Sequence, residues 1–216
     1  MNVMGIDCAS ARPSTCIVLS KHMDIVSSFQ STTVEWVGRA CDEFNVKLVA
    51  LDSPLGFPVG MCCLEESCSC APEDGRKGRA CERELMKVGI SSYFTTKKTI
   101  IKRMIYQAIQ WKQYLEHRGI SVIEIYPYAT KVMLFGKQMP KKESKEGLQW
   151  LRERIGLLIR NQHAAMTFNH DECDALLGAY TGLLHLQRQA IAVGDEQEST
   201  IVIPRQAYDA KQDIAV

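Results

Sequence analysis

The first 51 residues constrain the fold more than any other part of the chain. Three short runs of β-forming residues, 2–6, 15–20 and 25–30, follow one another through connections of only a few residues. Such connections predict an antiparallel meander, because a parallel crossover needs a dozen or more residues. A helical pattern over 33–44 then leads to an apolar run at 46–51, which should lie parallel to a neighbouring strand. The segment therefore predicts a mixed β-sheet with helices packed on it.

The rest of the sequence alternates helical and strand patterns. Residues 99–118 have helical periodicity and end before Gly119, 121–126 resemble a strand, and Ser144 is a suitable helix cap. A last helix is expected to begin near Asp171. Together these patterns predict an α/β fold with a mixed sheet and helices on both faces.

The domain organisation follows from where the periodicity stops. We predict a single domain over 1–204, completed by a short edge strand at 199–203. The segment 53–98 is rich in Gly, Pro, Cys and Lys and lacks clean periodicity, which predicts an insertion after the fourth strand. Residues 205–216 are expected to form a partly disordered tail.

Composition excludes several classes of protein. Of 216 residues, 46% are hydrophobic and 24% are charged, so neither a disordered nor a fibrous chain is expected. The sequence lacks an apolar run of about 18 residues, which argues against a membrane span, and its N-terminus lacks the apolar core of a secretory signal. We therefore expect a cytoplasmic protein with no membrane partner.

Acidic residues interrupt three apolar runs at or near their ends. Asp7 follows the first predicted strand, Asp52 follows the fourth, and Glu124 lies within the fifth. A buried carboxylate is costly unless it is paired or bound to a cation. Asp171 and Asp174 are three residues apart, so both can point from one helix face. Together with Asp7 and Asp52 they offer an all-oxygen site of the kind that Mg²⁺ or Mn²⁺ prefers.

Each of these acids also has a simpler interpretation. A single aspartate at a strand end is commonly a turn or cap residue, and Asp171 suits a helix N-cap or first turn. Glu124 has the alternative of pairing with an arginine. The joint occurrence favours a metal site, with Asp174 preferred to Asp171 as a ligand.

Several of these motifs resemble a known family. They are Gly-Ile-Asp-Cys-Ala (5–9), Asp-Ser-Pro-Leu-Gly (52–56), Arg-Ala-Cys-Glu-Arg (79–83), Glu-Ile-Tyr-Pro (124–127) and His-Asp-Glu-Cys-Asp-Ala (170–175). In this order, over about residues 3–187, they are similar to the motifs of domain of unknown function family 429. That family is predicted to have the ribonuclease H-like fold and is described as a predicted nuclease.

The resemblance implies a role for each acidic position. Asp7, Asp52 and Asp174 would be metal ligands, and Asp171 and Glu124 would be further acidic members of the site. The Asp-x-x-Asp spacing is also similar to a pair on the last helix of RuvC-like junction resolvases. Those resolvases have a longer Glu at the fourth strand, so the number of metal ions is left open.

A basic segment suggests how nucleic acid would be bound. Residues 76–118 carry eleven Lys and Arg against three Glu, interleaved with aromatic residues. We expect the aromatic residues of the 99–118 helix to pack in the core. The candidate phosphate contacts are Arg79, Arg83, Lys97 and Lys98, with Lys142 and Arg152 at positions that match basic residues of the family. Whether the chain forms a homodimer is left open.

The chain has nine cysteines, and this odd number does not suggest a set of paired disulfides. They are expected to be reduced. Four of them, Cys62, Cys63, Cys68 and Cys70, lie close together in the insertion. They could hold zinc or an iron–sulfur cluster, although their spacing is not the usual pair of Cys-x₂-Cys knuckles. Free or redox-active thiols are the alternative that the sequence favours.

The leading hypothesis is a metal-dependent nuclease that hydrolyses phosphodiester bonds of DNA or RNA. An actin-like nucleotide-binding phosphotransferase is a second hypothesis, weakened by the absence of glycine-rich phosphate loops from the sequence. The third is a non-catalytic module in which the acids hold a structural ion and the basic insertion binds nucleic acid or protein. Fold alone does not separate these hypotheses.

Overall fold

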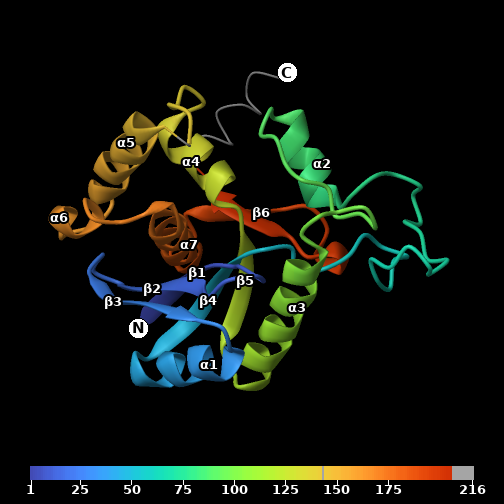
Figure 1. Ribbon diagram of the computed structural model, residues 1–216, viewed down its shortest axis with the longest axis horizontal. Helices are drawn as coiled ribbons and strands as arrows, with labels where there is room; N and C mark the ends of the chain where they lie inside the picture. The colour runs from blue at the N-terminus through green and yellow to red at the C-terminus, as the bar shows by residue number, and fades with distance from the viewer. Residues whose placement is uncertain (143, 206–216) are drawn as a thin grey trace.

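A mixed β-sheet lies at the centre of the computed structural model, which describes residues 1–142 and 144–205. Its strands are β1 (Asn2–Asp7), β2 (Ser14–Ser20), β3 (Ile25–Ser31), β4 (Val46–Asp52), β5 (Ser121–Ile125), β6 (Ala190–Val193) and β7 (Ile201–Pro204). Their order across the sheet is β3-β2-β1-β4-β5-β7-β6 (Figure 1). The first three strands form the predicted antiparallel meander, and β4 is parallel to β1 as expected.

Helices cover both faces of this sheet, as predicted. They are α1 (Val34–Glu43), α2 (Ala80–Lys87), α3 (Lys102–His117), α4 (Pro127–Phe135), α5 (Lys145–Gly156), α6 (Gln162–Ala165) and α7 (His170–Leu186). In Figure 1, α1 and α3 lie below the sheet, whereas α4, α5, α6 and α7 lie above it. A short 3₁₀ turn at Glu196–Glu198 precedes β7.

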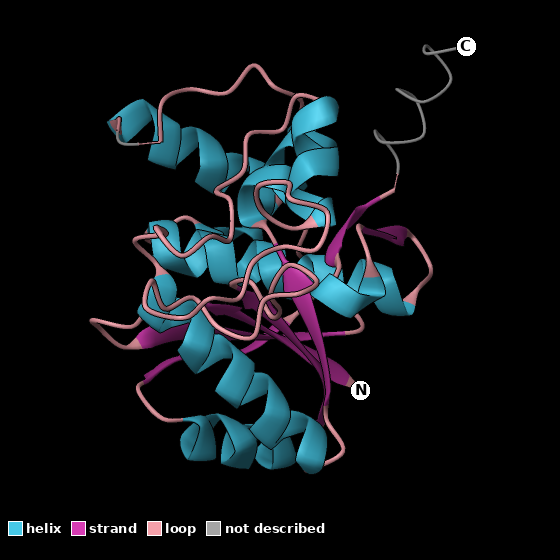
Figure 2. Ribbon diagram, turned by 90° about the vertical axis from the view of Figure 1, so that its right-hand side faces the viewer, coloured by secondary structure: helices cyan, strands magenta, loops and turns pink. Residues whose placement is uncertain are grey.

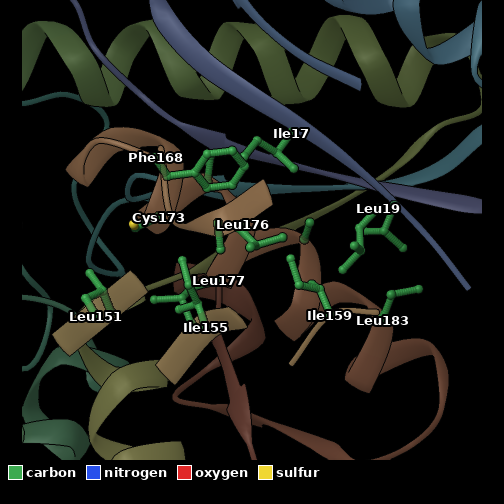
Figure 3. Close-up of a cluster of buried hydrophobic side chains, with 14 of the residues drawn as sticks. Ile17, Leu19, Leu151, Ile155, Ile159, Phe168, Cys173, Leu176, Leu177 and Leu183 are labelled. Carbon is green, nitrogen blue, oxygen red and sulfur yellow. The ribbon is translucent and has the colours of Figure 1, made fainter. Parts of the chain in front are cut away.

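Two apolar cores follow from this layering. The β1 and β2 side chains alternate between the two faces, because successive residues of a strand point in opposite directions. Ile17 and Leu19 pack against α5 and α7, as Figure 3 shows with Leu151 and Leu176. Cys16 and Val18, on the other face, belong to the core formed with α1 and α3.

Glycines let α7 approach the centre of the sheet very closely. A Cβ atom at Gly5 of β1 would lie 2.0 Å from the carbonyl oxygen of Ala175, and one at Gly182 would lie 2.6 Å from Val3 Cγ1. Only a residue without a side chain fits at either position. This close packing brings the start of α7 to the end of β1.

The structure corrects the sequence-based expectations in five places. The insertion 53–98, which we expected to be irregular, contains α2, and α4, α6 and the edge strand β6 were not predicted. The strand expected at 199–203 is β7, which lies between β5 and β6 rather than at the edge. Short elements such as these have too few residues to show a period. The tail predicted for 205–216 lies outside the described residues beyond Arg205.

The irregular parts of the insertion lie together beside the sheet. In Figure 1 the teal loop before α2 extends to the right, and Figure 2 shows the loops of this side in front of the strands. Within the described residues, none of the helices combines the length and apolar character that a membrane-spanning segment requires.

Candidate metal centre and its pocket

Asp7 and Asp52 end adjacent parallel strands and are register partners in the β1–β4 ladder. The carboxyl ends of parallel strands meet at one edge of a sheet, where α/β proteins commonly place their ligands. Both side chains are largely removed from solvent, and Asp7 is 9% exposed. The two aspartates that the sequence predicted to meet are therefore brought together by the sheet itself.

Asp174 adds a third carboxylate from α7. It lies in the second turn of the helix and is 5% exposed. Two lysines bind it: Lys131 Nζ lies 3.0 Å from Oδ1 and Lys142 Nζ lies 2.9 Å from Oδ2. Lys131 belongs to α4, the helix that sequence reasoning missed, so this contact had no signal in the sequence.

Burial and neighbouring carboxylates disfavour the ionised forms of Asp7 and Asp52. Burial raises the pKa of Asp7 to about 7, with further contributions from Asp174 and Asp171, while Arg12 acts in the opposite direction. The pKa of Asp52 is raised well above its ordinary value, first by burial and then by Asp174 and Asp7. When Asp7, Asp52 and Asp174 are all ionised, they carry more charge than Lys131 and Lys142 neutralise.

The chemistry of these residues suits a hard cation. Within the described part of the chain, only the four clustered cysteines have all their ligand atoms within 4.8 Å of one another, so the three carboxylates are less tightly grouped than the cysteines. The half-buried carboxylate of Asp52 accepts no hydrogen bond from the described residues. Such an acid, next to two others, fits the oxygen donor set that Mg²⁺ and Mn²⁺ take.

Asp171 occupies the rim of the site. Arg12 connects it to Asp7, with Nη1 2.6 Å from Asp171 Oδ2 and Nη2 3.4 Å from Asp7 Oδ2. The N-cap of α7 is Asn169, whose side chain accepts a hydrogen bond from the Glu172 N–H, so Asp171 is a first-turn acid and not the cap.

Glu124 is held by Arg79. The guanidinium donates to both carboxylate oxygens, at 2.6 Å and 2.7 Å, and to Glu82 at 3.0 Å. All three side chains are buried, and Arg79 is only 1% exposed. Burial raises the pKa of Glu124 and Arg79 opposes that shift. Glu124 therefore pairs with an arginine, which was the alternative interpretation of this acid. We had expected Arg79 to contact phosphate, but its side chain is buried and does not face solvent.

The other basic candidates are dispersed. Arg83 donates to the Gly78 carbonyl and to Asp74, and Lys97 donates to the Cys68 carbonyl. Lys98 is exposed on the insertion. Arg152 donates to the carbonyls of Phe168 and Thr167, which hold the segment that leads into α7. Apart from Arg79, which pairs with Glu124, Lys142 is the one predicted basic residue that contacts a predicted acid of the site within the described part of the chain.

A cavity of about 530 Å³ opens beside the carboxylates. Its wall combines Asp52 and Asp174 with both lysines of the site. Its lining also includes the aromatic residue Tyr93, which is 75% exposed. Two more tyrosines, Tyr126 and Tyr128, line the cavity, and the Tyr126 hydroxyl donates to the Ser91 carbonyl at 3.0 Å. None of the residues 126–131 was predicted to form part of a site.

The cysteine cluster forms a separate group in the insertion. All four Sγ atoms lie within 4.8 Å of one another, and those of Cys62 and Cys68 are 3.6 Å apart. Hydrogen bonding to the backbone of Cys63, and then of Cys62, lowers the pKa of the Cys70 thiol to about 6. The four thiols that the sequence places close together therefore also meet in space.

The arrangement of strands and helices defines a ribonuclease H-like fold. Thermus thermophilus RuvC has a similar structure, with a TM-score of 0.50 and 12% sequence identity over 93% of this chain and 99% of that one. A structure of T. thermophilus RuvC in complex with Holliday junction substrate has a TM-score of 0.49 with the same identity and coverage. The sequence matches no family model and no curated protein.

Proposed function

We propose that this protein is a metal-dependent nuclease that hydrolyses phosphodiester bonds of DNA or RNA. The observation that carries the proposal is the meeting of Asp7, Asp52 and Asp174 at one sheet edge, where burial and mutual repulsion leave the carboxylates short of positive charge. The ribonuclease H-like fold and the motif resemblance to domain of unknown function family 429 support the same activity.

In this proposal the three aspartates hold Mg²⁺ or Mn²⁺. The bound ion would activate a water molecule and stabilise the leaving oxygen of the phosphodiester. Lys131 and Lys142 already compensate Asp174, and the more exposed Lys142 is able to turn towards a substrate phosphate. Asp171 and Arg12 complete the rim, whereas Glu124 and Arg79 support the strand end from beneath.

The residues that line the cavity favour binding of a nucleotide. Tyr93 presents an exposed ring to it, and aromatic rings stack on bases of any sequence. The two lysines that line the same cavity suit the phosphate backbone. We therefore propose nucleic acid as the partner, bound with a phosphodiester between the carboxylates and the tyrosines.

The test is cleavage of labelled nucleic acids by the purified chain. Single-stranded, duplex, hybrid and branched substrates are incubated with Mg²⁺, Mn²⁺ or EDTA. Wild type is compared with Asp7→Asn, Asp174→Asn and the control Asp42→Asn, which changes an exposed acid on α1. We expect metal-dependent products that fall by about 10³-fold in both site variants and stay unchanged in the control.

Two results would contradict the proposal. Cleavage that survives equally in Asp7→Asn would show that the carboxylates are not the metal site. Nucleic-acid binding without turnover, in folded protein with metal bound, would favour the non-catalytic module. Stabilisation by free nucleotides alone would instead point to the phosphotransferase.

A further inference from the structure

We propose a structural zinc site in the insertion, formed by the thiolates of Cys62, Cys63, Cys68 and Cys70. We refer to residues 62–70 as the cysteine loop. This inference rests on the cysteine geometry alone and is independent of the proposed nuclease activity.

The sulfur positions suit one tetrahedral ion. Zinc–thiolate bonds of about 2.3 Å place the sulfurs of a tetrahedral site about 3.8 Å apart. The four Sγ atoms all lie within 4.8 Å of one another, and the Cys62–Cys68 separation is 3.6 Å. Small rotations about χ1 are enough to close the site, even though Cys62 and Cys63 are adjacent in sequence.

The same distances argue against an iron–sulfur cluster. In such a cluster the thiolates are divided between iron atoms that sulfide ions separate, so they lie farther apart than around one ion. Four soft thiolates in tetrahedral positions select zinc over Mg²⁺ or Mn²⁺, which prefer oxygen. The insertion would thus hold a different metal from the carboxylate site.

The cysteine loop has little else to order it. It contains no helix or strand, and of its nine residues only Leu64 is buried. Ordering a segment costs conformational entropy that so little apolar burial does not offset. A metal cross-link between 62–63 and 68–70 supplies that stabilisation, as in other small metal-bound segments.

Residues around the cysteine loop supply a positive charge and hydrogen bonds to the loop. One Zn²⁺ with four thiolates is an anionic group, and the Lys97 ammonium donates to the Cys68 carbonyl beside it. Tyr106 of α3 accepts a hydrogen bond from the Leu64 N–H at 2.7 Å and donates to Glu65 at 2.8 Å. The zinc site would therefore fix the loop against α3 and against the segment that carries Tyr93.

The first experiment measures metal in the full chain purified under reducing conditions. Elemental analysis should give about one zinc per chain, and Co²⁺ exchanged into the protein should show the absorption of a tetrahedral tetrathiolate site. Cys68→Ser and Cys70→Ser should lose both signals. Cys41→Ala is the matched control, because it removes a buried cysteine of α1 outside the cluster and should keep both.

A second measurement remains informative if a variant folds poorly. Alkylation of the wild-type thiols, followed by mass spectrometry, should be at least about tenfold slower at the four positions with zinc than after chelation. The proposal fails if the protein contains less than about 0.1 zinc per chain and the alkylation rates are the same with and without the chelator. Iron with sulfide in place of zinc, or a Cys62–Cys68 disulfide in the reduced preparation, would also overturn it. None of these readouts depends on nucleic-acid cleavage.

Discussion

Asp7 and Asp52 are register partners at the ends of two parallel strands, and the carboxylate of Asp7 helps burial and Asp174 to raise the pKa of Asp52. Folding brings these carboxylates together against their repulsion. Functional sites commonly oppose stability in this way, because the chemistry needs groups that the fold alone does not favour. A divalent cation would convert the repulsion into ligation.

The first prediction concerns stability without metal. The pKa of Asp7 is raised from 3.8 to about 7, so between these values the folded state binds more protons than the unfolded state. Stability in EDTA should therefore fall as pH rises from about 4 to about 7. Asp7→Asn removes the contribution of Asp7 and leaves that of Asp52, so the fall should be shallower, and at pH 8 the variant should be more stable than wild type by on the order of 2–4 kcal/mol. Urea unfolding across this pH range measures the effect.

Asp42→Asn is the control for that series, since its carboxylate is exposed and lies on α1, outside the site. Its curve should parallel that of wild type. The prediction is wrong if Asp7→Asn and wild type lose stability with pH at the same rate.

The second prediction concerns proton release on metal binding. A cation requires the ionised form of Asp7, so Mg²⁺ or Mn²⁺ should bind more tightly as pH rises through about 7. Below that value each tenfold rise in proton concentration should weaken binding by up to about tenfold. Calorimetry in two buffers of different ionisation enthalpy measures the released protons. Affinity that is flat from pH 5 to pH 8 would contradict the assignment.

Much of the fold was predictable, because its signals are local. The meander, α1 and β4 have clear periods, and Ser144 caps α5 as expected, accepting from the Gly147 N–H at 2.9 Å. The four-residue strand β6 is too short to show an alternation, and the nine-residue helix α4 is too short to show a clear helical period. The position of β7 inside the sheet depends on long-range pairing with β5 that no local pattern encodes.

In the candidate site, too, the locally encoded features were predictable and the long-range ones were not. Asp7 and Asp52 were found from the sequence because each ends an apolar run, and Asp174 was found from its spacing to Asp171. The cationic partners of these acids were not predicted. Lys131 lies on an unpredicted helix, and Arg79, which was predicted to contact phosphate, pairs with Glu124. Charge type is visible in a sequence, but burial and pairing between distant segments are tertiary properties.

The third prediction separates the two lysines of Asp174. The Lys131 side chain is 9% exposed and that of Lys142 is 54% exposed. Lys131→Met leaves a buried carboxylate less compensated and should lower stability in EDTA by about 2–3 kcal/mol. Lys142→Ala should cost less than about 1 kcal/mol, because solvent screens an exposed pair. Urea unfolding measures both.

Binding of a fluorescent oligonucleotide supplies the matching readout for Lys142. Removing one phosphate contact should weaken binding and make it less dependent on salt. A Lys142→Ala variant that binds nucleic acid as wild type does, with the same salt dependence, would exclude this lysine from the substrate surface. Lys112→Ala, which changes a basic residue of α3 outside the cavity lining, is the control.

The fourth prediction concerns the buried pair formed by Arg79 and Glu124. Arg79→Met leaves the Glu124 and Glu82 carboxylates without their cation and should destabilise the protein by about 3–5 kcal/mol. The control Arg76→Met breaks a pair in which the arginine is 66% exposed and should cost less than about 1 kcal/mol. The double variant Arg79→Met/Glu124→Leu should recover part of the loss, because it removes one of the two stranded charges. Urea unfolding gives all three values, and equal losses for Arg79→Met and Arg76→Met would show that the buried pair has no structural role.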